Sequence, residues 1–315
     1  MKKIAYIIFA FFALILLALV AVPYLFKDKI FDKLDQELAK SVNATVYYDR
    51  DKVSLSVFSN FPSLSAGLGD FGVKGNPPFQ NDTLVHVGEL QVDLNILSVI
   101  FSDKPSLEGI RLKDGQIYVK VLEDGQANYD IAYESEVEEP VDTTSSDFQL
   151  GIESIEIENL DFIYDDRSLD FLMVMSAMDF VGSGDLTLDV YDLIIKGEGN
   201  IVNVAYEGIE YLTSKSLAID SEINVDLKNM KFGVNGASLK LNDFGFGIDG
   251  YLAMPGDDIE MDAKFYGEDN NFRSALSLVP GVYSASFDDL KTSGEMDFSG
   301  ALKGVYNENT FPSFQ

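Results

Sequence analysis

Several residue types are missing or rare in this sequence. It contains no cysteine, no tryptophan and a single histidine, His86. Without cysteine the chain forms no disulfide bond, no thiolate metal site and no cysteine nucleophile, and such a chain suits an oxidising compartment. One histidine does not supply a typical zinc site, and no Ser-His-Asp arrangement is indicated. We expect His86, which lies between Val85 and Val87, on the solvent side of a strand.

Basic residues are also scarce. The chain has 52 aspartates and glutamates against 23 lysines and arginines, which gives a net charge of −29. A surface this acidic repels phosphate backbones and anionic lipid surfaces, so it argues against nucleic-acid binding and broad adhesion to such membranes. The hydrophobic content of 46% is too high for a disordered acidic chain. We therefore expect a folded, strongly solvated protein.

The sequence contains no recognisable catalytic motif. It has no GxSxG, no phosphate-binding loop, no dinucleotide-binding glycine pattern and no EF-hand spacing. Asp165–Asp166 and Asp257–Asp258 are carboxylate pairs, but solvated turn charges explain them better than a calcium site does. With 52 acidic residues, a glycosidase-like pair arises by chance. We predict no enzymatic activity, no cofactor and no metal site.

The N-terminal region predicts a membrane anchor. No charged residue occurs from Ile4 to Phe26, and Lys2 and Lys3 precede this run. A helix of this length crosses a hydrocarbon core of ~30 Å. A cleaved signal peptide would have a shorter apolar region and small residues at its cleavage site, and ALVAVPYLF offers only weak sites. We predict a cytoplasmic tip and transmembrane anchor in residues 1–26, with export of the rest.

Residues 27–40 have the spacing of an amphipathic helix. The apolar side chains recur at helical intervals, at Ile30, Phe31, Leu34 and Leu38. We interpret this segment as a stalk that packs one side onto the following domain. An interfacial helix on the membrane is the alternative.

Beyond Ser41 the apolar periodicity changes to the alternation of strands. Apolar residues alternate from Val85 to Ile96, with a slip at Gly88–Glu89 that we interpret as a bulge. Similar runs recur along the chain, and a short helix is expected from Leu94 to Phe101. About a dozen strands or more predict a mainly β protein whose large antiparallel sheet curls, splits or closes.

Short stretches that combine glycine with aspartate, asparagine, serine or proline mark the predicted turns. Asp114–Gly115 predicts a hairpin, and further turns are expected at Gly182–Ser183–Gly184, Asn235–Gly236, Asp249–Gly250 and Pro255–Gly256–Asp257. The stretch DGQANYDI, residues 124–131, also predicts a tight turn, in which Gly125 supplies the positive φ, Asp124 bonds to the backbone and Asn128 braces the exit. We assign no reaction to it.

A break in composition divides the predicted β region. Residues 134–147 contain four glutamates and almost no large apolar residue, which predicts a flexible acidic loop. It separates a first part of the sheet, 41–133, from a continuation, 148–315. A boundary between two domains is possible here, but the same alternation on both sides favours an insertion into one continuous sheet.

One predicted strand is apolar on both sides. In DFLMVMSAMDF, Phe171, Met173 and Met175 alternate with Leu172 and Val174, which fits either a fully buried strand or the wall of an apolar cavity. From alternation alone, the candidate groove-lining residues are Val92, Leu94, Leu112, Val119, Phe171, Met173, Met175, Phe244 and Phe246. An ordinary closed core explains any one of them as well.

The ordered series of segments resembles the N-terminal part of the AsmA family. It runs from FPSLSAGLGDFGVKG (Phe61–Gly75) through Leu84–Ile131, which ends in the signature turn of Asp124, Gly125 and Asn128. The N-terminal span and the helix after it fit the same pattern. The later segment Ile163–Leu193 is similar to the versions found in Bacteroidota-like Gram-negative bacteria.

This resemblance implies an anchor in the inner membrane and a body in the periplasm. It implies a long β-sheet curled into an open apolar groove, related to TamB and to bridge-like lipid-transfer proteins, and a role in outer-membrane lipid homeostasis and assembly. The family supplies no catalytic residues. Its members are usually longer, and Phe311–Pro312–Ser313 repeats the strand opening Phe61–Pro62–Ser63, so we expect further groove beyond Gln315.

Two functions follow as hypotheses. In the first, the groove shields or conducts phospholipid, with acyl chains on apolar side chains and acidic residues outside. In the second, the protein is an anchored scaffold or chaperone that influences the targeting and assembly of outer-membrane or other periplasmic proteins by strand addition at an open edge. A continuous, uncovered apolar floor favours the first, and sheets packed face to face exclude a conduit.

Overall fold

The structure is a computed structural model that describes residues 32, 35–36, 42–56, 63–101, 106–131, 149–256, 258–268, 270–279, 292–307 and 309–315, with backbone alone at 99–100 and 149–151. The predicted anchor (4–26) and the predicted acidic loop (134–147) lie outside this part of the chain. Of the predicted helix 27–40, Asp32, Asp35 and Gln36 are described, and they are helical. Within the described ranges, no helix is both long enough and apolar enough to span a bilayer.

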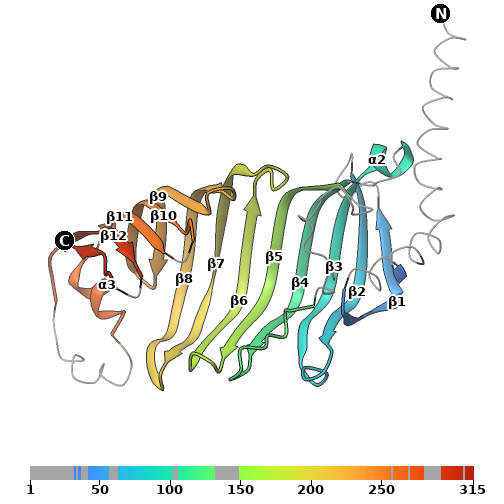
Figure 1. The fold of residues 1–315 in the computed structure, drawn as a ribbon, viewed down its shortest axis with the longest axis horizontal. Coiled ribbons are helices and arrows are strands. Elements are labelled where there is room, and N and C mark those ends of the chain that lie inside the picture. Colours follow the sequence, from blue (N-terminus) through green and yellow to red (C-terminus); the bar gives the residue numbers. More distant parts are fainter. Residues whose placement is uncertain are drawn as a thin grey trace, which may run out of the picture. The chain divides into compact units, whose positions relative to one another are not determined.

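The prediction of a mainly β protein built on a long antiparallel sheet is confirmed. The described strands hydrogen-bond in chain order, and every pair whose register is described is antiparallel (Figure 1). The strands are β1 (Ala44–Ser56), β2 (Ser63–Gly75), β3 (Thr83–Asn95), β4 (Ser106–Val121), β5 (Gln149–Asp166), β6 (Phe171–Ser183), β7 (Val190–Tyr206), β8 (Ile209–Asp226), β9 (Lys231–Leu241), β10 (Phe244–Ala253), β11 (Ile259–Glu268), β12 (Ser299–Tyr306) and β13 (Ser313–Phe314). In the described ranges two short helices lie between the strands, α2 (Ile96–Phe101) and α3 (Phe272–Leu276).

The chain forms two compact units, and their boundary falls within β4. Unit 1 consists of Met1–Ile110 and Asn128–Leu150, and unit 2 of Arg111–Ala127 and Gly151–Gln315. The acidic loop predicted at residues 134–147, interpreted as an insertion into one continuous sheet in preference to a domain boundary, lies outside the described residues and stays a prediction.

Unit 1 has an apolar side and a side of glycines and polar residues. Leu64 pairs with Leu94, and Ala66 pairs with Val92, so their side chains lie together on one side of β2 and β3. Ile96, at the start of α2, packs against Leu64. The predicted helix over 94–101 is therefore confirmed, although it begins two residues later, because the Asn95 side chain accepts a hydrogen bond from the Ser98 backbone N–H at 3.0 Å and caps it.

The slip predicted at Gly88–Glu89 is shared by both strands of a pair. Gly69 pairs with Glu89 and Phe71 with Val87, so β2 and β3 keep their register across the slip. Asp70, between these pairs, has a φ of 50°. A bulge adds a residue to one strand and would shift the register. Because β2 and β3 change their alternation at the same place and stay in register, the interpretation of the slip as a bulge was wrong.

Three predicted turns lie inside strands. Asp114–Gly115 is within β4, Asn235–Gly236 within β9 and Asp249–Gly250 within β10. A two-residue type I′ turn needs a positive φ at both central residues, and each of these pairs has it at one, namely Asp114 (54°), Gly236 (67°) and Gly250 (134°). The hairpin and both turns were wrong predictions, because one left-handed residue bends a continuing strand.

Other glycines do end strands. Glu207–Gly208, which the sequence analysis did not single out, has φ values of 49° and 73° and joins β7 to β8. As predicted, β6 ends at Ser183, and Pro255 and Gly256 separate β10 from β11.

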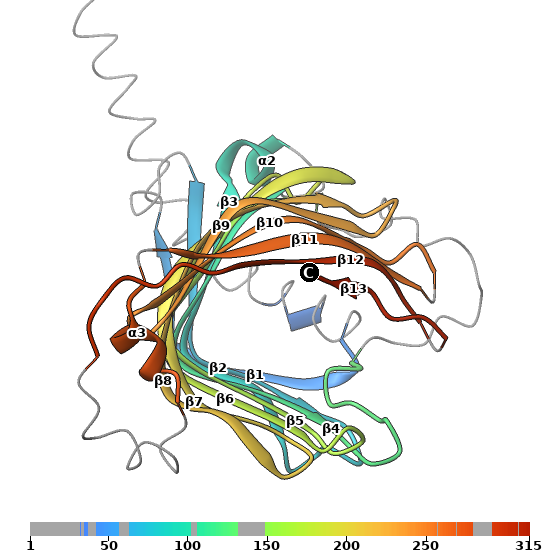
Figure 2. The ribbon, with the colours of Figure 1, turned by 90° about the vertical axis from the view of Figure 1, so that its left-hand side faces the viewer.

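A row of left-handed residues bends the long strands of unit 2. Asp114, Asn159, Ala177 and Ser214 lie inside β4, β5, β6 and β8, with φ values of 54°, 50°, 47° and 52°. The registers of β5 with β6 and of β6 with β7 shift beside this row. Figure 2 shows these strands turning over their length.

Aspartate side chains satisfy the backbone groups that the bends take out of the ladder. Asp179 Oδ1 accepts a hydrogen bond from the Asn159 backbone N–H at 2.8 Å, and Asp161 Oδ1 accepts one from the Ala177 N–H at 3.1 Å. Asn159 Nδ2 donates to Asp114 Oδ1 at 2.7 Å. These side chains replace the ladder hydrogen bonds that the bend removes, and so stabilise the bend at these positions.

Candidate apolar binding surface

One side of the unit 2 sheet is apolar across its strands. Residues that pair across antiparallel strands point to the same side, so registers identify the side without reference to exposure. Met175 pairs with Phe162 on β5 and with Ile201 on β7. Further along, Leu217 pairs with Leu241, which pairs with Phe244, and Phe246 pairs with Leu239. The pairs continue with Ile248 and Phe265 and with Ala263 and Leu302. We call this side, from β4 to β12, the apolar face.

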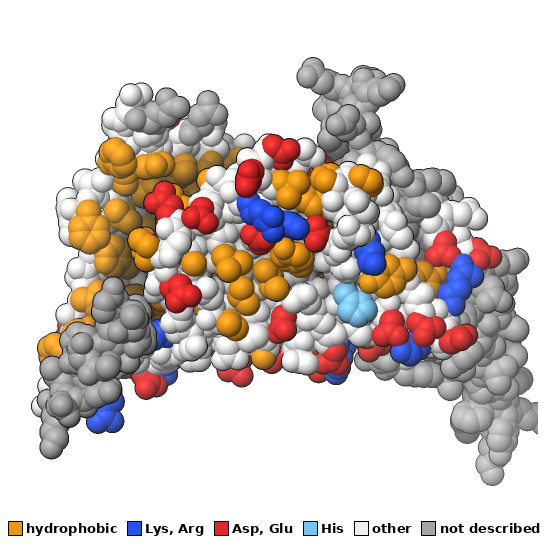
Figure 3. All heavy atoms as spheres, turned by 90° about the horizontal axis from the view of Figure 1, so that it is seen from below, with side chains coloured by type: hydrophobic (Ala, Val, Ile, Leu, Met, Phe, Trp, Pro, Cys, Tyr) orange, Lys and Arg blue, Asp and Glu red, His pale blue; other side chains and the backbone are white. Residues whose placement is uncertain are grey.

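The other side carries cross-strand ion pairs and is called the charged face here. Arg111 Nη2 lies 2.5 Å from Glu156, Lys113 Nζ 2.6 Å from Glu158 and Lys196 Nζ 3.0 Å from Asp220. In Figure 3 acidic and basic side chains lie beside apolar ones over the middle of the view, and apolar side chains are densest at the end that holds β9 to β12. Exposed pairs stabilise a fold by at most about 1 kcal/mol each, so their main effect is to keep this face in water.

Much of the apolar face is half-buried rather than closed off. Met173 and Met175 are partly exposed, and among the residues of β6 only Met178 is buried. The interpretation of this segment as a fully buried strand is therefore wrong. Among the described residues, the apolar side chains of this face therefore stay partly accessible from one strand to the next.

The structure brings seven of the nine predicted groove residues to the apolar face. Phe171 follows the alternation of Met173, and Phe244 and Phe246 join it through their pairing with Leu241 and Leu239. Leu112 lies between Arg111 and Lys113, whose side chains reach the charged face, so its own side chain points the other way. Val119 follows Tyr118, which donates a hydrogen bond to Asp165 of the charged face. Val92 and Leu94 belong to unit 1.

The segment around α3 covers one end of the apolar face. The Phe298 ring stacks on Phe244 at 5.4 Å and meets Phe246 edge-on at 5.9 Å, which leaves Phe244 only 5% exposed. Asn270 extends the ladder with both amide atoms, because Nδ2 donates to the Gly245 carbonyl at 2.8 Å and Oδ1 accepts from its N–H at 2.9 Å. Sequence analysis missed this cover, since no local pattern relates Phe298 to β10.

Lys215 was also missed. It lies on β8, two residues before Leu217, and pairs with Ile201 of the apolar face. Its side chain is 6% exposed, and Nζ donates to the Ser277 carbonyl at 2.6 Å. Lys215 is two residues before Leu217 and four before Ile219, so alternation along the strand already predicts all three side chains on the same side.

At the turn from β5 to β6, local donors hold a carboxylate in its charged form. The Ser168 hydroxyl donates to Asp166 at 2.6 Å, the Leu169 N–H donates at 3.1 Å and the Tyr164 hydroxyl at 3.1 Å. The hydrogen bond from Ser168 contributes most to lowering the pKa of Asp166 below its usual range, and partial burial opposes it. Such a carboxylate is a turn-forming group and a poor proton donor.

The signature stretch after β4 forms a turn. The Gly125 N–H donates to the Leu122 carbonyl at 2.9 Å, and Gly125 has a φ of 84°. Asp124 Oδ1 accepts from the Gln126 N–H at 3.1 Å. Asn128 is 1% exposed. These contacts organise the backbone and leave no arrangement of acid and base for chemistry.

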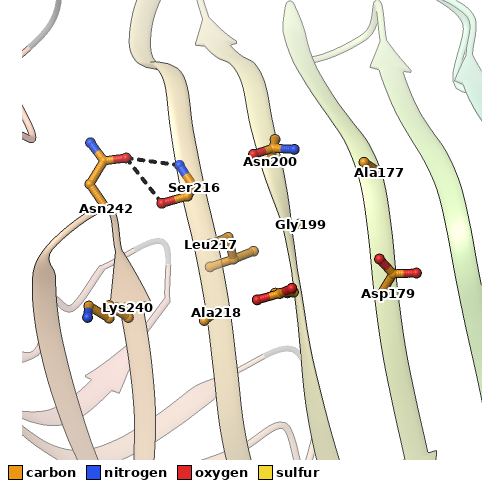
Figure 4. Close-up of a pocket in the computed structure, with 10 residues that line it drawn as sticks. Ala177, Asp179, Gly199, Asn200, Ser216, Leu217, Ala218, Lys240 and Asn242 are labelled. Carbon is orange, nitrogen blue, oxygen red and sulfur yellow. Dashed lines mark hydrogen bonds between the residues drawn. The ribbon is translucent and has the colours of Figure 1, made fainter.

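A polar hollow lies on the charged face of unit 2. It has a volume of about 560 Å³ and is bordered by Asp179, Glu198, Lys240 and Asn242 on β6, β7, β9 and the turn after β9. Figure 4 shows Asn242 turned toward Ser216, whose N–H donates to Asn242 Oδ1 at 2.9 Å. Over the part of the chain that the structure describes, no group of acidic or histidine side chains is arranged to hold a metal ion.

The fold and the two faces define a class of protein, a long antiparallel sheet with one apolar and one charged side. The chain belongs to the AsmA family, whose model matches residues 1–181. This confirms the resemblance seen in the sequence. The family is non-enzymatic. No curated protein matches the sequence.

Proposed function

We propose that the protein shields or conducts phospholipid along the apolar face, which serves as the floor of an open groove. The observation that carries this proposal is the continuity of apolar cross-strand pairs from β5 to β12. Membership of the AsmA family supports it, as does the row of bends at Asp114, Asn159, Ala177 and Ser214, because bent strands make a floor concave.

The physical basis is the separation of the two faces. Covering acyl chains with apolar side chains stabilises them by roughly 0.8 kcal/mol per CH₂ group removed from water. Methionines such as Met173 and Met175 adapt to chains of different shape. Apolar walls discriminate poorly between acyl chains, so low specificity for the chain is expected.

The proposed location is the Gram-negative inner membrane, with Ile4–Phe26 as the single span, the N-terminus in the cytoplasm and the body in the periplasm. A protein held there by its span meets phospholipid at the membrane surface without needing surface charge to bind it. The proposed role is outer-membrane lipid homeostasis and assembly, as the family resemblance implies.

A photo-crosslinking residue tests the lipid proposal in the full, membrane-embedded chain. Met173 lies on the apolar face, and Val174, its neighbour on β6, points to the opposite side. Benzoylphenylalanine at position 173 is expected to crosslink radiolabelled phospholipid on illumination, and the same group at 174 is the matched control. Equal lipid crosslinking at both positions, or none at 173, contradicts the proposal.

A second candidate function rests on the edge at β12. β13 pairs with this edge at Leu302 and Lys303, and Gln315 bonds to Ala301 beside them, so the described chain covers only part of β12. Phe311 and Phe314 beside this edge are 78% and 71% exposed. An anchored scaffold or chaperone for outer-membrane or periplasmic proteins would add a partner strand to such an edge. Protein adducts from a crosslinker at Val305, with no lipid adduct at Met173, favour this function.

A further inference from the structure

Lys215 is an unusual residue for the surface on which it lies. It pairs with Ile201, stands two residues before Leu217 and is 6% exposed. The other described lysines and arginines of the strands in unit 2 are on the charged face, as in the pairs of Arg111 with Glu156 and Lys196 with Asp220. Within the described strands of this unit, Lys215 is thus the only cation on the apolar face.

The ammonium group of Lys215 has neutral partners. Nζ donates to the Ser277 carbonyl at 2.6 Å and, more weakly, to the Val279 carbonyl at 3.4 Å. An ammonium group has three N–H donors, so these two contacts leave one donor for a further acceptor. No described carboxylate makes an ion pair with Lys215, whereas the lysines of the charged face named above have one each.

Anchoring α3 does not require this charge. Asn242 Nδ2 already donates to the same Ser277 carbonyl at 2.9 Å, and Asn270 and Phe298 fix the segment elsewhere. Within the described residues this buried cation has no counter-ion, which is costly, and a neutral donor can make the same bond to a carbonyl. An anion that arrives with the ligand would offset this cost.

We propose that Lys215 recognises the phosphate of a phospholipid whose acyl chains lie on the apolar face. This inference rests on the proposed function and adds a headgroup preference to it. A hydrogen bond from the ammonium group to phosphate is charged at both ends, whereas the Ser277 and Val279 carbonyls are neutral acceptors, so phosphate is the stronger partner. The net charge of −29 repels small anions in solution, so the phosphate must be carried to Lys215 by an apolar chain.

Paired ligands in detergent solution test this inference on the full chain. Phosphatidic acid and diacylglycerol with the same acyl chains differ only in the phosphate group. The unaltered protein is expected to bind phosphatidic acid at least about tenfold more tightly, a typical effect of one charge-assisted contact. Lys215→Met is expected to abolish this preference while retaining diacylglycerol binding, and Lys215→Arg to retain it.

Matched variants separate headgroup recognition from a structural effect. Lys240→Met removes an exposed lysine of the charged face and is expected to leave the preference unchanged. Lys215→Gln keeps a donor for the Ser277 carbonyl without the charge, so it serves if Lys215→Met fails to fold. Thermal unfolding of each variant shows whether the fold is retained.

The outcomes distinguish this inference from the proposal on which it rests. If the unaltered protein binds neither ligand, the groove function fails. If it binds both and Lys215→Met or Lys215→Gln keeps the same preference, the inference about Lys215 is overturned and the groove function stands. If inorganic phosphate competes with phosphatidic acid, the site takes free phosphate, and recognition of a lipid-borne group is wrong.

Discussion

At the scale of single residues, partial burial and one hydrogen bond set the ionisation of Tyr48. Its hydroxyl donates to Asp35 Oδ1 at 2.7 Å, which joins β1 to the helical residues before it within unit 1. Burial and then this bond to Asp35 raise the pKa of Tyr48 from 10.0 to about 12. The uncharged phenol is therefore favoured in the folded chain.

A spectrophotometric titration of tyrosine checks this prediction. The difference between the unaltered protein and Tyr48→Phe is expected to show one phenol with a midpoint near pH 12. Because the folded pKa lies above the unfolded value, the phenol contributes stability fully below pH 10, and this contribution is lost as the pH rises toward 12. Asp35→Asn should lower the midpoint only in part, since burial is the larger cause. A midpoint near pH 10 would contradict the contact.

At the scale of strands, the row of left-handed residues predicts opposite effects for one substitution. Ala177 has a φ of 47° and is exposed, so its Cβ is strained and packs against little. Ala177→Gly is expected to raise the free energy of unfolding by about 0.5–1 kcal/mol. Ala218→Gly, in an ordinary part of β8, is expected to lower it by a similar amount. Chemical denaturation of both variants measures the change in the free energy of unfolding. If Ala177→Gly lowers this free energy, Ala177 is not strained and the prediction is wrong.

Alternation in the sequence predicted strands better than it predicted their ends. Alternation relates Met173 to Met175 within one strand, because side chains two residues apart point to the same side. The registers show that Phe246 lies on that side too, and that these residues line a groove stays a prediction. Asp114–Gly115 was misplaced in a hairpin, because one dipeptide supplies the same left-handed φ to a turn or to a bulge. Only the contact with β5, between Asn159 and Asp114, distinguishes a turn from a bulge here. These two residues are 45 positions apart in the sequence, so no local pattern reveals the contact.

The candidate surface shows the same limit. Its apolar residues were predictable one strand at a time, but the cover that Phe298 places over Phe244 comes from a distant segment. Lys215 breaks the apolar pattern of β8 at a position that local parity already assigned to the apolar face. A charged residue that alternation places on the apolar side of a strand is therefore itself a candidate functional residue.

At the scale of the whole molecule, the separation of apolar and charged faces predicts how function responds to a misplaced charge. Met173 and Val174 are adjacent on β6 and point to opposite sides. Met173→Asp puts a carboxylate among the side chains proposed to contact acyl chains, where desolvation costs several kcal/mol. Val174→Asp puts the same charge on the side that already carries ion pairs. The first variant is therefore expected to lose phospholipid binding at least about tenfold, and the second to keep it.

Native mass spectrometry of the full chain, released from detergent, measures this difference. Discrete phospholipid masses are expected on the unaltered protein and on Val174→Asp, and are expected to be depleted on Met173→Asp. Both variants are compared at equal folded fraction, established by circular dichroism, because a charge on β6 also perturbs packing. If both variants lose lipid alike, the effect is one of stability. If neither does, lipid lies elsewhere, and strand addition at the β12 edge becomes the better account of the protein.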